Sequence, residues 1–338
     1  MKGGRMREGT LIEFLTYEGA PIAVPAFRII AVLEGDIHDE ANRPGLTRAY
    51  GMFEAAFDEA ADTASYNFPG HKGKLRKITA SLKKDGRAFF AREETSYGEG
   101  LRRYSRAFAD FEEPALPFFG VEQRSYECFL ELDLPADDAR ILSLAEDIAG
   151  ELGRTRTIWA VMGMGFFLPP YKSSLAFMLG RSIGRYRTGI DISPSMVTDG
   201  LRREGSAHRW KEDEQPGIPD LGWKTFIGRE FWPRIPDVAV ALKAEPDITV
   251  EELDNALVIT AGDRPIWGDV DQGEDISAYY TVAKHLSPIA YPVEAGKAFM
   301  FGGDTYDAGH VARVEAYLTR YMQAYKKEGR QALTPKPR

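Results

Sequence analysis

The chain has 338 residues, of which 43% are apolar and 28% charged, and its net charge is −8. These values are typical of globular proteins and exclude disordered, fibrous and collagen-like classes. The single cysteine, Cys128, excludes an internal disulfide framework and any cysteine-based metal site, and so favours a reducing compartment, the cytoplasm.

Export and membrane segments are not expected from the sequence. No apolar signal-peptide region precedes Glu18, and the longest uncharged run, residues 157–171, is shorter than the about 20 residues that a spanning helix needs. We interpret this run as buried core.

The first third of the chain predicts a strand, a helix and further strands. The apolar run Ala26–Leu33 is typical of a buried strand. After Pro44, apolar residues recur three and four positions apart from Leu46 to Ala60, which predicts an amphipathic helix. Short strands are expected at Leu75–Leu82 and Arg87–Ala91.

The same order recurs in the middle of the chain. Tyr126–Leu134 alternates apolar and polar residues and predicts a half-buried strand. A helix is expected from Asp137 or Asp138 to Gly153, and a strand over Thr155–Met162. The two units predict an α+β fold of mixed or antiparallel sheets packed with helices, in two pseudo-repeated strand-helix-strand halves.

In the last third, Ala256–Ala261 predicts a strand, and a helix is expected from Asp275 or Ser277 through His285. The final helix is predicted over Tyr306–Lys327, with a buried stripe of Val311, Val314, Leu318 and Tyr321. Residues 205–219 are expected to form an exposed loop. We expect a single α+β domain over residues 1–338, with halves at 10–120 and 121–330 and a frayed tail at 331–338.

Charge is unevenly distributed along the chain. Residues 211–275 contain sixteen acidic and six basic residues, a net charge of −10. A segment of this kind repels nucleic acid and anionic membranes and attracts cationic partners, although a solvated surface without a partner is the simpler alternative. Residues 72–106 have the opposite balance, but the negative total and the absence of a named motif argue against nucleic-acid binding.

One enzyme motif is present. Residues 180–184 match the G-x-S-x-G pattern of serine hydrolases, with Ser182 as the nucleophile. A triad would need a histidine and an acid from the rest of the chain: His285 or His310, and Asp269 or Asp304. Because the strand-to-helix context of the motif is poor, a serine hydrolase is the alternative function and not the first choice.

Other chemistry is not predicted. The five histidines are scattered, and the acidic run 269–275 has Gly273 where a calcium loop needs an oxygen ligand, so we expect no metal and no cofactor. The run Gly163–Gly165 lacks the third glycine of a nucleotide-binding loop and indicates close backbone packing. No complete nuclease motif follows Pro236-Asp237 or Pro246-Asp247, which disfavours a nuclease.

Four segments carry a resemblance to a known family: 185–192 (RYRTGIDI), 222–228 (GWKTFIG), 259–270 (ITAGDRPIWGDV) and 279–288 (YYTVAKHLSP). In order and spacing they resemble the bacterial type VI secretion immunity family, formerly filed as a domain of unknown function. The resemblance covers about the last 150 residues. Asp263 replaces a proline of the family pattern, and Lys224 stands where an apolar residue usually follows the tryptophan.

The resemblance implies a non-enzymatic cytoplasmic immunity protein that binds and neutralises a cognate effector of the type VI secretion system. Nucleases are among the effectors of such families, and a nuclease holds phosphates on a basic face. A homodimer is compatible with the sequence. The expected partner-binding residues lie in and beside a Gly- and Pro-shaped turn within the acidic segment: Asp263, Asp269, Asp271, Glu274 and Asp275.

Overall fold

The computed structural model describes residues 15–17, 20–68, 71–72, 76–92, 103–107, 116–124, 127–169, 181–192, 217–291, 312 and 315–321. Its strands form one antiparallel sheet in the spatial order β11-β12-β10-β9-β2-β8-β7-β6-β3-β4, with β1 paired to β2 and β5 to β3. The strands are β1 (Leu15–Tyr17), β2 (Ala20–Glu34), β3 (Thr63–Phe68), β4 (His71–Lys72), β5 (Arg76–Lys77), β6 (Arg103–Ala107), β7 (Phe118–Arg124), β8 (Glu127–Pro135), β9 (Thr157–Phe167), β10 (Lys224–Gly228), β11 (Ile248–Glu252) and β12 (Ala256–Ala261).

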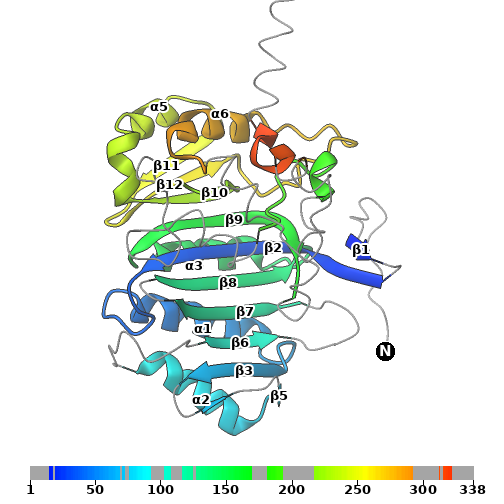
Figure 1. Ribbon diagram of the computed structural model, residues 1–338, viewed down its shortest axis with the longest axis vertical. Helices are drawn as coiled ribbons and strands as arrows, with labels where there is room; N and C mark the ends of the chain where they lie inside the picture. The colour runs from blue at the N-terminus through cyan, green and yellow to red at the C-terminus, as the bar shows by residue number, and fades with distance from the viewer. Residues whose placement is uncertain are drawn as a thin grey trace, which may run out of the picture.

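Helices pack against this sheet, so the α+β fold predicted from the sequence is confirmed. The α-helices are α1 (Arg43–Phe57), α2 (Ala80–Ala91), α3 (Ile141–Leu152), α5 (Val238–Lys243) and α6 (Ser277–Leu286), and the 3-10 helices are η2 (Arg181–Gly184), η3 (Arg229–Arg234) and η4 (Ser287–Ile289). In Figure 1, α1 and α3 lie behind the sheet, and α5 and α6 lie at the end formed by β10, β11 and β12.

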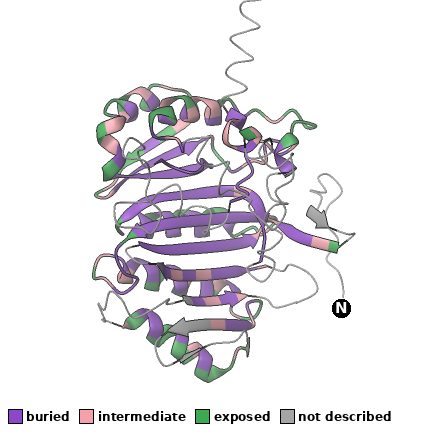
Figure 2. Cartoon of the chain, in the orientation of Figure 1, coloured by how far each residue is buried: buried purple, intermediate pink, exposed green. Residues whose placement is uncertain are grey.

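The centre of the sheet is β2, which pairs with β8 on one side and β9 on the other. Ile29–Leu33 is fully buried, and Figure 2 shows the neighbouring strands buried along most of their length. Arg28 is the one charged residue in the apolar run Ala26–Leu33, and it is only 1% exposed. A buried guanidinium needs partners inside the protein, and these determine much of the architecture.

The strand predicted at Tyr126–Leu134 is confirmed as β8, but its predicted half-burial is wrong. Both of its faces are buried. Glu131 and Asp133 belong to the alternating polar set, and Asp133 lies directly opposite Arg28 in the sheet. The polar side of β8 therefore binds an internal cation instead of facing water.

The strand predicted at Arg87–Ala91 is wrong, as is the end of the one predicted at Leu75–Leu82. Among the described residues of this range, only Arg76–Lys77 form a strand, β5, and α2 follows it. The Thr79 side chain accepts a hydrogen bond from the Leu82 amide, which caps the helix N-terminus. Leu82, Gly86, Phe89 and Phe90 are buried at helical spacing, a periodicity that the prediction missed.

The helices predicted after Pro44 and before Gly153 are confirmed as α1 and α3. α3 begins at Ile141, so Asp138 lies before the helix, where its side chain accepts a hydrogen bond from the Arg140 amide at 2.9 Å. The strand predicted to end at Met162 continues to Phe167.

Glycines in β9 let a second segment lie against the sheet. A Cβ added at Gly165 would lie 2.2 Å from the carbonyl oxygen of Ile190. The Ile190 amide donates to the Met164 carbonyl at 2.9 Å. The close packing expected at Gly163–Gly165 is confirmed, and the segment 185–192 is held on this face of the sheet.

In the last third, the predicted strand Ala256–Ala261 is β12, and the predicted helix ending at His285 is α6. Most of the predicted final helix lies outside the described residues, including Val311 and Val314. Tyr321 of that stripe is buried, whereas Leu318 is partly exposed. Within the described chain, no helix has the length and apolarity to cross a bilayer.

The sheet runs through both predicted halves, since β2 of 10–120 pairs with β8 and β9 of 121–330. The division into halves stays a prediction. The segment 205–219 is described only from residue 217, and the tail 331–338 lies outside the described residues.

Candidate functional site

The predicted partner-binding residues lie in the turn between β12 and α6, residues 262–275, which we call the acidic turn. Gly262, Gly268 and Gly273 have φ angles of +80°, +63° and +65°. Side chains with a Cβ rarely adopt these values, so the three glycines allow the chain to bend here. The turn is thereby a compact loop on a buried strand.

Arg185 braces the acidic turn from the side. Its guanidinium donates to Asp269, with Nε 3.2 Å from Oδ1 and Nη2 3.1 Å from Oδ2. This hydrogen bond lowers the pKa of Asp269, whose residue is 3% exposed. The Val270 amide also donates to the Arg185 carbonyl at 3.1 Å. Asp269 therefore holds the turn together and does not present its carboxylate to a partner.

The other predicted residues divide into braced and outward carboxylates. Glu274 is braced, since its Oε2 accepts from the Asp269 amide at 2.8 Å. Asp275 is exposed and accepts a hydrogen bond from the amide of Ser277, the first residue of α6, at 2.9 Å, and its hydrogen bonds with Ser277 lower its pKa. Asp271, 67% exposed at its side chain, lies 3.2 Å from Arg185, and Asp263 is exposed. Three carboxylates of the turn are therefore exposed, and we call them the outward face: Asp263, Asp271 and Asp275.

The segment 185–192, which contains Arg185, also contacts Arg28 of β2. Arg28 Nη1 donates to the carbonyls of Ile190 at 2.8 Å and Ile192 at 2.6 Å. Its Nε donates to Asp133 and its Nη2 to Glu131, both at 2.7 Å. A single buried guanidinium thus joins β2, β8 and the segment 185–192, which ends in the Ile-Asp-Ile triplet of the family resemblance.

The acids around Arg28 are held in a low-dielectric environment. Burial raises the pKa of Glu131 to about 8, with repulsion from Asp133 adding to the effect and Arg28 opposing it. Burial likewise raises the pKa of Asp133 and of Asp191. One guanidinium cannot compensate three nearby carboxylates, so the folded protein retains a proton here that the unfolded chain releases.

This proton predicts a pH dependence of stability. Because the folded pKa of Glu131 is raised, its contribution is fully present below the ordinary value of 4.5 and is lost as pH rises through about 8. We expect the free energy of unfolding to fall over this window by up to roughly 1.4 kcal/mol per pH unit. Glu131→Gln should flatten the profile, measured by urea unfolding at a series of pH values; an unchanged slope would contradict it.

Ser182 of the G-x-S-x-G motif contacts Asp191, one of the acids near Arg28. Its hydroxyl donates to Asp191, which also accepts from the Phe166 amide at 3.2 Å. Ser182 is 7% exposed and sits in the one-turn helix η2. Among the described residues no histidine hydrogen-bonds to it, and His310 lies outside them. The motif here anchors the segment 185–192.

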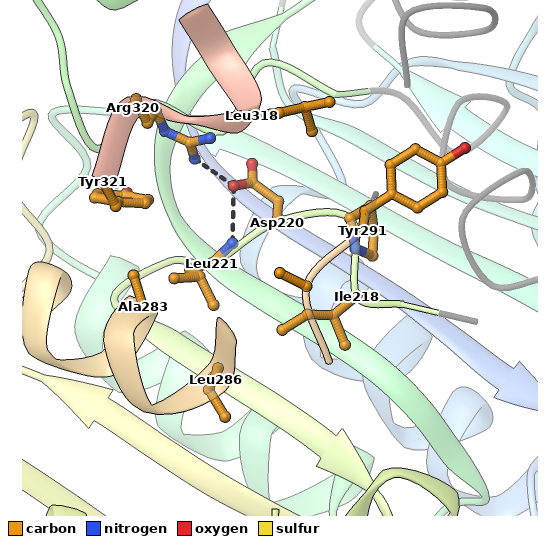
Figure 3. Close-up of a pocket in the computed structure, with 11 residues that line it drawn as sticks. Ile218, Asp220, Leu221, Ala283, Leu286, Tyr291, Leu318, Arg320 and Tyr321 are labelled. Carbon is orange, nitrogen blue, oxygen red and sulfur yellow. Dashed lines mark hydrogen bonds and ion pairs between the residues drawn. The ribbon is translucent and has the colours of Figure 1, made fainter. Parts of the chain in front are cut away.

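A second buried ion pair lies on the other side of this segment. Arg320 donates to Asp220, and the hydroxyl of Tyr317 donates to the same carboxylate. The Tyr317 hydroxyl also accepts from the Asp191 amide at 2.9 Å, which links the two buried clusters. Asp220 and Arg320 line a cavity between residues 218–221 and α6, and its volume is about 50 Å³. Figure 3 shows the two side chains pointing toward each other among the residues that line it. This volume accommodates a few water molecules at most, so we interpret the cavity as part of the core.

The four segments of the family resemblance contact one another. Trp223 Nε1 donates to the Gly262 carbonyl at 3.3 Å, and Thr188 Oγ1 donates to the Ile266 carbonyl at 2.5 Å. α6 packs against β12. These contacts hold the acidic turn against β10, β12 and the segment 185–192.

Sequence reasoning assigned no role to six of the residues that form these buried clusters: Arg28, Glu131, Asp133, Asp220, Tyr317 and Arg320. It included Asp191 only as part of the segment 185–192. One signal was available, since Arg28 is a lone charge within an apolar strand. The other residues are ordinary surface types in sequence, and only the fold brings them together. No group of metal-ligating side chains is found among the described residues.

Comparisons with known proteins support the fold. No family model and no curated protein matches the chain, so family membership stays an expectation. Its fold is that of the type VI secretion system protein PA0821 of Pseudomonas aeruginosa, with a TM-score of 0.66 and 15% identity over 96% of this chain and 91% of that one.

A weaker match is to the complex of the toxic C-terminal tip of CdiA from P. aeruginosa with its immune protein. The TM-score is 0.21 and the identity 12%, over 44% of this chain and 88% of that one. A likeness at this level carries no argument about the present chain.

Proposed function

We propose that this protein is an immunity protein that binds and neutralises a cognate type VI secretion effector, expected to be a nuclease, in the cytoplasm of the producing cell. Two findings support the proposal: the fold of a type VI secretion system protein and the four segments that resemble the immunity family. The observation that carries it is the outward acidic face on a braced turn.

The geometry of that face suits a basic partner. Asp263, Asp271 and Asp275 are exposed on a turn fixed by Arg185 and Asp269. A loop that is already ordered loses little entropy on binding, and clustered negative charge accelerates association with a cationic surface. The phosphate-binding face of a nuclease is such a surface. Catalysis by the chain itself is not part of the proposal, since Ser182 is buried against Asp191.

The proposal predicts a charge-dependent association rate. Replacing Asp263 and Asp271 by serine should slow binding to the effector encoded by the adjacent gene by roughly tenfold at low ionic strength, with a smaller effect at high salt. Asp275 is kept because it accepts a hydrogen bond from the amide of Ser277 at the start of α6. The rate is measured by stopped-flow fluorescence at two salt concentrations, alongside a thermal melt.

A matched control removes the same charge elsewhere. Glu40 and Glu59 are exposed near the two ends of α1, so replacing both by serine gives an equal change in net charge. This control should retain the wild-type rate. Equal association rates for all three proteins would show that the acidic turn is not part of the interface. If the wild-type protein did not bind the effector at all, the proposed function would be contradicted.

A further inference from the structure

A groove separates α3 from the hairpin of β11 and β12, away from the acidic turn. Its volume is about 380 Å³. Ala149, Leu253 and Val258 supply apolar lining, and Glu251 and Asp254 stand among the polar residues around it. The groove therefore combines an apolar surface with carboxylates.

The carboxylates around the groove are only partly neutralised. Lys224 is buried and contacts Glu146 at 3.1 Å, with a hydrogen bond to Thr260 at 3.3 Å. Glu251 and Asp254 are exposed and have no ion-pair partner among the described residues. Two cations also line the groove, Lys224 and Arg154, and each already pairs with another carboxylate, Lys224 with Glu146 and Arg154 with Glu151 at 3.0 Å. Glu251 and Asp254 thus remain as two carboxylates that neither cation neutralises.

One helix residue leaves the groove open. A Cβ added at Gly150 of α3 would have no atom within 4 Å, so a larger side chain there would extend into free space. By contrast, a Cβ at Gly153 would lie 2.2 Å from Cδ1 of Leu253, where α3 packs closely against the hairpin. The groove is therefore bounded by tight packing at Gly153 and accessible at Gly150.

We propose that this groove receives an arginine or lysine side chain of the partner protein. The methylene stem of such a residue covers apolar surface while its cationic head stays at the rim, and a carboxylate pairs best with a charged donor. An acidic side chain would be repelled, and a short apolar one would leave the carboxylates unpaired. The inference rests on the proposed function, since it names a second contact with the basic partner.

The test fills the groove without altering its charge. Gly150→Trp replaces an exposed helical glycine, so the fold should be retained, and Gly51→Trp is the matched control because Gly51 of α1 also has no atom within 4 Å of an added Cβ. The probe is a blocked arginine-glycine repeat peptide, with a glutamate-glycine repeat as the negative probe. Binding is measured by isothermal titration calorimetry.

We expect the arginine peptide to bind wild type and Gly51→Trp alike, and to bind Gly150→Trp and the pair Glu251→Gln with Asp254→Asn about tenfold more weakly. The inference is overturned if wild type does not bind the arginine peptide, if Gly150→Trp binds it equally, or if the glutamate peptide binds as well. An effector that binds wild type and Gly150→Trp equally also overturns it while leaving the proposed function intact. An effector that binds neither wild type nor Gly150→Trp contradicts the proposed function. In that case the peptide measurement alone tests whether the groove binds a basic side chain.

Discussion

Arg28→Met is expected to destabilise the protein by about 3 to 5 kcal/mol, because it leaves buried carboxylates without their cation. Arg28 contacts Glu131, Asp133 and the carbonyls of Ile190 and Ile192, and all four residues are buried. The free energy of unfolding in urea measures the loss.

A second variant keeps this prediction testable if the single change prevents folding. Arg28→Met combined with Glu131→Gln and Asp133→Asn removes the uncompensated charge and should recover part of the lost stability. A loss below about 1 kcal/mol for Arg28→Met alone would show that the guanidinium does not organise the core.

Gly165→Ala should cost about 3 kcal/mol or more, since the new Cβ would lie 2.2 Å from the Ile190 carbonyl oxygen, which belongs to the packed backbone of the segment 185–192. The segment 185–192 would have to move away from β9, which would also displace Arg185 from Asp269. Thermal and urea unfolding measure the effect.

Gly150→Ala is the matched control, and its expected effect has the opposite sign. Gly150 is an exposed helical glycine with open space around it, so alanine should stabilise the protein by about 0.5 to 1 kcal/mol. If Gly165→Ala and Gly150→Ala behaved alike, the segment 185–192 would not be held against β9 as described.

Periodicity predicted the elements of the fold wherever local pattern decides them. The apolar run at Ala26–Leu33 and the helical stripe after Pro44 correspond to β2 and α1. Prediction was wrong at α2, where strands were expected but the Thr79 cap and the helical spacing of the buried residues Leu82, Gly86, Phe89 and Phe90 favour a helix. The burial of β8 could not be predicted, because its acids bind Arg28, 103 and 105 positions away.

The same reasoning explains what could be predicted of the candidate site. Gly, Pro and Asp at 262–275 predicted a turn rich in carboxylates, and the turn is present. The division of those carboxylates into braced and outward ones depends on Arg185, which is 84 positions from Asp269 in the chain. The groove between α3 and the β11–β12 hairpin has no sequence signal, since it exists only where α3 and the sheet end meet.

The most direct test of the immunity function is protection of living cells. Bacteria that express the effector encoded by the adjacent gene should die, and co-expression of this protein should restore growth. The Asp263→Ser, Asp271→Ser variant should protect less well at equal protein level, whereas the Glu40→Ser, Glu59→Ser control should protect fully. Cells that die despite abundant wild-type protein would contradict the account.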